Sequence, residues 1–208
     1  AEGPHPFFVH INFRSDVPDR YMPTEELIDN GFAVLSFGYE DVTRDDGDFT
    51  SGLAGVLYEN GKRAPHDAGK IALWAWAAMR CMDYAEHDER LDCAKSVVCG
   101  HSRLGKTALL TAALDTRFAF GYSNDSGCAG AALFRGKKGE QLDDIYRQFP
   151  FWFSESFGQY VGKTDALPFD QHYLLASIAP RYVYVASATG DDWADPASEL
   201  LSCYAAQI

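Results

Sequence analysis

The stretch SVVCGHSRLGKTALL, residues 96–110, fits two different motifs, and the choice between them decides the fold. From Gly100 it reads G-x-x-x-x-G-K-T, the pattern of a phosphate-binding loop. Around Ser102 it reads as a strand, a sharp turn, a serine and a helix, the layout of a hydrolase nucleophile elbow. The first would hold phosphate with backbone N–H groups, whereas the second would attack a carbonyl carbon with a hydroxyl.

The composition indicates one ordinary globular domain. The chain has 208 residues, of which 47% are hydrophobic and 23% charged. A formal net charge of −12 would repel a phosphate backbone, so we expect no nucleic acid partner. The longest apolar run covers nine residues, 71–79, which is too short to cross a membrane. The opening AEGPHPFF carries no initiator methionine and no signal-peptide pattern, so either a leader has been removed or the chain is an internal piece.

Neither a disulfide framework nor a metal site is predicted. The five cysteines (81, 93, 99, 128 and 203) are odd in number and form no C-x-x-C, so we expect buried free thiols. The loop DVTRDDGDF places four aspartates within eight residues. It does not fit a calcium loop, because Asp46 stands where the tight-turn glycine belongs and Gly52 where the closing glutamate belongs. We predict a solvated acidic loop there, and no cofactor.

Predicted strands and helices alternate along the chain. Strands are expected at residues 7–13, 32–39, 96–99, 118–123 and 182–188, and helices at 23–30, 66–86 and 103–114, with a long loop over 41–65. Strands separated by helices imply a mainly parallel sheet covered on both faces. The chain shows no repeat or linker, which indicates a single domain over residues 1–208.

The residues around Gly100 favour the nucleophile elbow. A phosphate loop needs further glycines between its two ends, but those positions here are His, Ser, Arg and Leu. An elbow needs a strand that ends just before the serine and a small residue two positions before it, which residues 97–99 and Gly100 supply. The usual glycine two residues after the serine is Leu104, with Gly105 one position later. A lone serine at this place could also be a simple helix N-cap.

Segments along the chain support the esterase interpretation. They are GHSRLGKTAL, NDSGCAGAAL, FPFWF, LPFDQH, IAPR and ASATGDDWADP. Their sequences, order and spacing resemble carbohydrate esterase family 15, the glucuronoyl esterases and their bacterial relatives, from about residue 7 to the C-terminus. This resemblance implies an α/β-hydrolase fold, a three-layer sandwich around a mainly parallel sheet, and a secreted or periplasmic protein.

The resemblance also implies an activity. It is that of a serine esterase which cleaves, through an acyl-enzyme, the ester between a 4-O-methyl-glucuronic acid of glucuronoxylan and a lignin alcohol. The alternatives are an acetyl xylan esterase, a catalytically inactive carbohydrate-binding hydrolase homologue and, more distantly, a P-loop nucleotide-binding protein.

The elbow region supplies the first site residues. Ser102 is the expected nucleophile. The backbone N–H of Arg103, at the start of a helix, is an expected oxyanion donor. Lys106 lies one helical turn after Ser102 on the same face. By the resemblance, the Arg103 side chain leans toward the oxyanion and Lys106 binds sugar hydroxyls.

The remaining site residues rest on the later segments. By the resemblance, Glu140 and Trp193 line the uronic acid site, although Glu140 could be a solvated helix carboxylate and Trp193 a core residue. Two aspartates are candidates for the triad acid. Asp125 follows the strand after the elbow, where many family members carry a glutamate, and Asp191 follows the last strand, the usual hydrolase position. We favour Asp191, with Asp125 assisting; Asp192 and Asp195 are expected to be loop or cap residues.

The expected base is missing from this chain. In α/β-hydrolases the order is serine, acid, histidine, but no histidine follows Asp191. His172 is the last histidine, and His101 should point away from Ser102. We therefore predict a central fragment, incomplete at both ends and lacking the first and last strands, which is inactive alone and whose sheet another piece of the same protein completes. The alternative is that His172 is recruited as the base.

Overall fold

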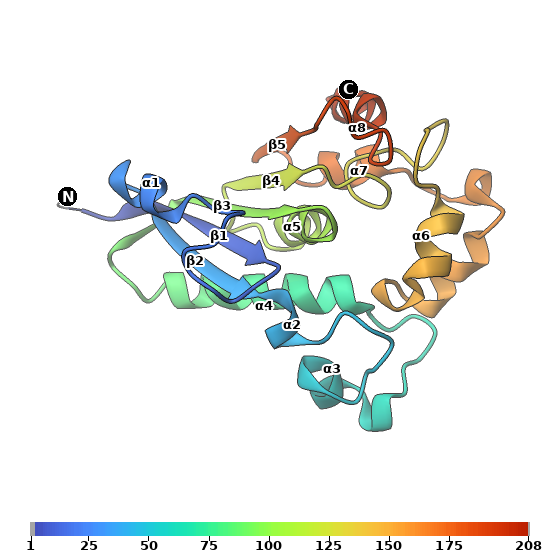
Figure 1. Ribbon diagram of the computed structural model, residues 1–208, viewed down its shortest axis with the longest axis horizontal. Coiled ribbons are helices and arrows are strands. Elements are labelled where there is room, and N and C mark those ends of the chain that lie inside the picture. Colours follow the sequence, from blue (N-terminus) through green and yellow to red (C-terminus); the bar gives the residue numbers. More distant parts are fainter. Residues whose placement is uncertain (1–2, 208) are drawn as a thin grey trace.

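The computed structural model describes residues 3–207 and contains a five-stranded sheet (Figure 1). Its elements, in chain order, are β1 (His5–Asn12), α1 (Thr24–Asp29), β2 (Ala33–Gly38), α2 (Tyr39–Val42), α3 (Gly52–Leu57), η1 (Glu59–Gly61), α4 (Lys70–Ala85), β3 (Leu91–His101), α5 (Arg103–Leu114), β4 (Phe120–Asn124), α6 (Leu142–Gln148), η2 (Pro150–Trp152), η3 (Glu155–Tyr160), η4 (Thr164–Ala166), α7 (Gln171–Ala176), β5 (Tyr182–Ala186) and α8 (Pro196–Ala205).

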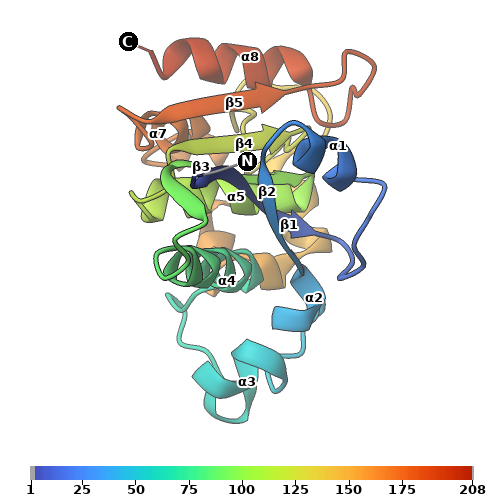
Figure 2. The same cartoon turned by 90° about the vertical axis from the view of Figure 1, so that its left-hand side faces the viewer.

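All strand pairings are parallel, and the strand order is β2-β1-β3-β4-β5. Parallel neighbours end at the same edge of a sheet, so the loops that follow β2, β3, β4 and β5 gather on one side of the molecule. Figure 2 shows the arrowheads of β4 and β5 pointing toward the same side of the molecule. The alternation predicted from the sequence is thus confirmed as an α/β-hydrolase-type sheet.

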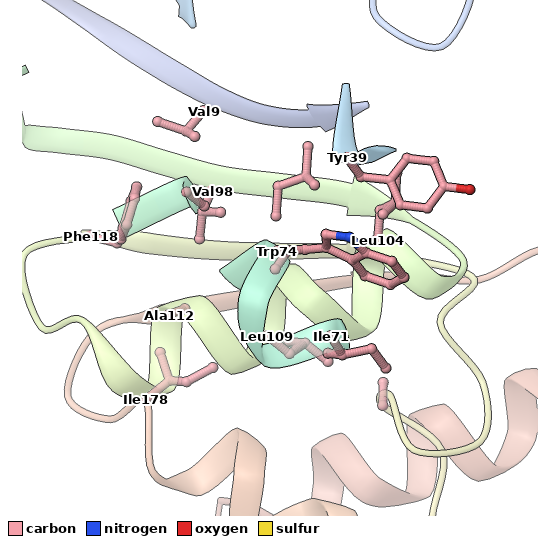
Figure 3. Close-up of a cluster of buried hydrophobic side chains, with 14 of the residues drawn as sticks. Val9, Tyr39, Ile71, Trp74, Val98, Leu104, Leu109, Ala112, Phe118 and Ile178 are labelled. Atoms are coloured by element: carbon pink, nitrogen blue, oxygen red, sulfur yellow. The ribbon is translucent and has the colours of Figure 1, made fainter. Parts of the chain in front are cut away.

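The core lies between the sheet and the helices α4 and α5 (Figure 3). Both helices carry an apolar face, and Trp74, Leu104 and Leu109 are fully buried against Val9 and Val98 of the central strands. The sequence predicted that helices cover both faces of the sheet, but within residues 3–207 the opposite face is only partly covered at β4 and β5. There, the exposed large side chains are Phe120, Tyr182 and Tyr184.

The predicted loop over residues 41–65 is wrong in part, because it contains the end of α2 and all of α3 and η1. The helix α3 reads GLAGVL, and its two glycines hide the helical pattern in the sequence. The strand predicted at 96–99 is the end of the longer β3. Its first half is mostly polar or exposed and pairs with β1 through only one register position, His5 with Leu91, so its pattern gave no strand signal.

The structure also bears on the predictions made for the cysteines and for membrane-spanning segments. All five cysteines are free, as predicted, but only Cys99 and Cys128 are fully buried; the others are half-buried. Burial raises the pKa of the Cys99 and Cys128 thiols to about 12. Among residues 3–207, no helix has the length and apolar character needed to cross a bilayer.

Candidate active site

Ser102 is the only residue between the end of β3 and the start of α5. Its backbone has φ 56° and ψ −124°, a strained conformation for a residue with a side chain. Its N–H donates to the Asn124 carbonyl at 2.9 Å, and its side chain makes no helix-capping bond. Ser102 thus stands at the N-cap position of α5 without capping it through its side chain, and the turn has the geometry of a nucleophile elbow.

Two glycines allow the strand and the helix to meet so tightly. A Cβ at Gly100 would lie 2.3 Å from the Leu104 carbonyl oxygen, and one at Gly105 would lie 3.0 Å from the Ser123 hydroxyl. Gly105 thus permits the close approach that a glycine one position earlier gives in the usual motif. A phosphate loop needs several loop residues between strand and helix to surround an anion, and this turn has one. The nucleotide-binding alternative is therefore wrong.

A polar cavity of about 230 Å³ opens beside Ser102. It brings together every site residue that the sequence predicted, from segments as far apart as the elbow and the loop after β5. Its lining consists of Ser102, Arg103, Lys106, Asp125, Ser126, Gly127, Glu140, Gln148, Phe149, Trp152, Asp191, Trp193 and Ala194.

Arg103 turns its side chain along one wall of this cavity. The guanidinium forms an ion pair with Asp45 and lies over the rings of Trp152 and Phe149, at 4.9 and 5.3 Å from their centroids. These two rings stack on each other with centroids 3.9 Å apart. Asp45 belongs to the acidic loop that the sequence predicted to be solvated; that prediction is wrong for Asp45, whose side chain is 7% exposed.

Lys106 and Glu140 form a buried pair of opposite charges within the lining. Lys106 donates to the Ser126 carbonyl and lies 3.9 Å from the Glu140 carboxylate. Burial lowers the pKa of the lysine and raises that of the glutamate, and the attraction between them opposes both changes. Glu140 precedes α6 and is buried, so the alternative of a solvated helix carboxylate is wrong. A fixed donor and a fixed acceptor side by side suit the recognition of sugar hydroxyls.

Trp193 lies at the rim of the cavity, and the residue is 56% exposed. The alternative that it is a core residue is therefore wrong. Its carbonyl accepts from the Glu140 N–H at 3.0 Å, which ties the loop after β5 to the segment before α6. An exposed indole beside a polar cavity is available to cover one face of a sugar ring.

Both candidate acids line the cavity, each in the loop that follows a strand. Asp125 follows β4 with φ 44°, and its carboxylate accepts from the Ala188 N–H at 2.6 Å. Asp191 follows β5, and its carboxylate accepts from the Ala194 N–H at 3.0 Å. Of the other two aspartates, Asp192 is exposed, and Asp195 caps α8 by accepting from the Ser198 N–H at 3.1 Å.

Glu199 is a buried residue next to the site that the sequence did not reveal. It is 0% exposed on α8, and it accepts from the Gly127 N–H at 2.7 Å and from the hydroxyls of Ser126 and Ser187. These donors come from the loops after β4 and β5, so Glu199 joins the two loops that carry Asp125 and Asp191. In the sequence it is an ordinary glutamate on a short helix; only the adjacent family-like segment ASATGDDWADP pointed to this region.

None of the six histidines lines the cavity in the described part of the chain. The His101 ring bonds to the Asn124 side chain at 2.9 Å and stacks on Tyr21, as expected for a residue that points away from Ser102. His172 lies on α7, and its Nδ1 is buried without a hydrogen-bond partner among residues 3–207. Those residues also hold no cluster of three or more histidine, cysteine, aspartate or glutamate side chains arranged to bind a metal ion.

Comparison with known proteins gives consistent results. A family model described as "Glucuronyl esterase, fungi" matches residues 2–208. The carbohydrate esterase MZ0003, from an unknown prokaryotic organism, is 44% identical over 184 residues, which are 88% of this chain and 43% of that protein. A 4-O-methyl-glucuronoyl methylesterase of Podospora anserina is 30% identical over 92% of this chain and 40% of its own length.

Comparison of the fold with solved structures points to the same family. A solved glucuronoyl esterase of carbohydrate esterase family 15 from Teredinibacter turnerae superposes with a TM-score of 0.91 at 33% identity. The superposition covers 99% of this chain and 54% of that one. The chain thus spans less than half the length of the curated relatives named above.

Proposed function

Because the chain belongs to the glucuronyl esterase family, carbohydrate esterase family 15, we propose that it carries the nucleophile of a serine esterase. The proposed substrates are esters of 4-O-methyl-glucuronic acid, such as those between glucuronoxylan and lignin alcohols. The name of the Podospora anserina relative supports the acid part of this substrate.

The observation that carries the proposal is the strained backbone of Ser102 at a cavity lined by charged and polar groups. The positive φ sets the serine at the carboxyl edge of the sheet, facing the space that Arg103, Lys106 and Glu140 border. Strain of this kind costs about 1–3 kcal/mol and persists where the surroundings impose it. A purely carbohydrate-binding site would not require this strained turn at a serine.

Each site residue would have its own role in the proposed reaction. The Ser102 Oγ would bond to the ester carbonyl carbon while its proton passes to a base, and the carbonyl oxygen would become the oxyanion. The Arg103 N–H and guanidinium would stabilise that charge. Expulsion of the alcohol, with a proton returned to it, leaves an acyl-enzyme that water then hydrolyses to the free acid. Lys106, Glu140 and Trp193 would hold the sugar ring in place meanwhile.

The base would come from polypeptide outside these 208 residues. No described histidine lines the cavity, and a positioned base contributes about 10²–10⁴-fold to the rate. Within residues 3–207, β5 pairs only with β4, and Tyr182 and Tyr184 on it are exposed. This edge can accept a further strand, which would bring new loops to the side of the sheet where Ser102 lies. His172 is disfavoured as the base, because it sits on α7 away from the cavity lining.

The test compares full-length wild-type protein with Ser102→Ala on benzyl 4-O-methyl-glucuronate and on acetylated xylan. We expect hydrolysis of the glucuronate ester, and its loss in Ser102→Ala with an unchanged circular dichroism spectrum. Preference for acetylated xylan would identify an acetyl xylan esterase instead. If neither ester is cleaved by the wild type, an inactive carbohydrate-binding homologue becomes the better interpretation.

A further inference from the structure

The Asp45 side chain connects the acidic loop after β2 to distant parts of the chain. One carboxylate oxygen accepts from the Trp152 indole N–H at 2.6 Å. The other accepts from the Tyr39 hydroxyl at 3.1 Å and pairs with the Arg103 guanidinium. Each oxygen therefore has at least one fixed partner, and the partners come from three separate parts of the chain. An exposed aspartate could not keep such a geometry, but this side chain is 7% exposed.

The loop that carries Asp45 is itself anchored to the core. Lys70, which is 0% exposed, donates to the Thr43 hydroxyl at 2.8 Å and to the Asp48 carbonyl at 2.6 Å. The Trp74 indole donates to the Thr43 carbonyl at 3.0 Å. Both donors belong to α4, so the backbone is tied on both sides of Asp45. In Figure 3, the Tyr39 hydroxyl points away from the apolar cluster, and it is this hydroxyl that donates to Asp45.

We propose that Asp45, fixed in this way, is a positioning residue that holds the Arg103 guanidinium in place beside Ser102. This inference rests on the proposed function, in which Arg103 stabilises the oxyanion. The guanidinium is held by Asp45 and by the Trp152 ring beneath it. Its Nε is buried and has no hydrogen-bond partner among residues 3–207, so Asp45 is the acceptor that holds the guanidinium in that part of the chain.

The charges around the cavity explain why Arg103 needs such a partner. Asp125, Glu140 and Asp191 also line the cavity, and each could attract a free guanidinium. Arg103 would then neutralise an acid instead of facing the oxyanion. A buried carboxylate outside the cavity lining, bonded to Arg103 in a fixed geometry, prevents this. The Phe149 and Trp152 rings restrict the remaining movement of the arginine.

The first test is Asp45→Asn in the full-length protein. The amide keeps the shape and can still accept from Trp152, but it removes the charge that pairs with Arg103. We expect kcat on benzyl 4-O-methyl-glucuronate to fall by roughly 10- to 100-fold, with KM changed by less than about twofold. The matched control is Asp46→Asn, one residue on, whose ion pair is with Arg44 at the surface. It should keep the wild-type kcat.

The second test separates positioning from general structural support. Arg103→Gln is combined with Asp45→Asn, and we expect the second substitution to change kcat by less than about twofold once Arg103 is absent. If Asp45→Asn lowers kcat by the same factor with and without Arg103, the inference is overturned.

A crystal structure of Asp45→Asn gives a readout that does not need activity. We expect the Arg103 guanidinium to leave the Trp152 ring and turn toward the carboxylates of the cavity. If it keeps its place, Asp45 does not position it. A wild-type protein without esterase activity would refute the proposed function alone, and this structural comparison would still decide the role of Asp45.

Discussion

Replacing Gly100 by alanine tests whether the close contact between β3 and α5 sets the geometry of the elbow. The new methyl group would lie 2.3 Å from the Leu104 carbonyl oxygen and 2.5 Å from its carbonyl carbon. Favourable contacts between non-bonded atoms begin at about 3.5 Å, so the helix has to withdraw by roughly 1 Å. The obstacle is helix backbone, which cannot rotate away as a flexible side chain would.

The expected loss of stability follows from what α5 buries. Leu104, Ala108, Leu109 and Ala112 are all fully buried on it, so withdrawal opens gaps along the whole contact with the sheet. Forcing an extra methyl group into a packed core costs about 1–3 kcal/mol. We expect the upper end of that range, about 3 kcal/mol in the free energy of unfolding. Because Ser102 moves with α5, a 1 Å displacement should also lower kcat/KM by about 100-fold.

The stability is measured by urea denaturation followed by tryptophan fluorescence, and kcat/KM with benzyl 4-O-methyl-glucuronate in the full-length protein. Gly47→Ala is the matched control, since a Cβ there has no heavy atom within 4 Å. That variant should range from unchanged to about 1 kcal/mol more stable, because alanine restricts the unfolded chain. If Gly100→Ala unfolds within about 0.5 kcal/mol of the wild type and keeps its activity, the contact does not set the elbow geometry.

Two further predictions concern the acid and a buried histidine. Asp191→Asn should lower kcat by up to ~10⁴-fold, and by more than Asp125→Asn does. The reason is that Asp191 follows β5, the usual place of the residue that orients the base. The reverse ranking would make Asp125 the acid. Burial lowers the pKa of His10 from 6.5 to about 4, so the unfolded chain binds its proton more readily than the folded one. Lowering the pH from 7 to 5 should therefore reduce the free energy of unfolding by about 2 kcal/mol through this histidine, and the loss begins as the pH falls through 6.5. In urea-denaturation curves, His10→Gln should remove this pH dependence.

Local sequence determined the elbow. Residues 96–107 contain the strand, the turn and the first turns of the helix, so neighbouring residues favoured an elbow at Ser102 with Arg103 and Lys106 beside it. The later family-like segments were needed to choose the nucleophile over a helix N-cap. The predicted helix at 103–114 has the bounds of α5. The alternation of strands and helices predicted the parallel sheet, because hydrophobic periodicity reflects contacts within each element. The resemblance to the family supplied Glu140, Trp193 and the two acids, and the cavity brings all of these together.

Tertiary structure alone decided which side chains support them. Asp45 meets Arg103 across 58 positions and Trp152 across 107, and Glu199 meets Ser126 across 73. No local pattern records such pairings, since they exist only where the loops after parallel strands converge. In the sequence, Asp45 is one of four aspartates in a polar segment, and solvation is the ordinary state of such a residue. A carboxylate is stable when buried only if charged and polar partners surround it, and the fold supplies these from distant segments.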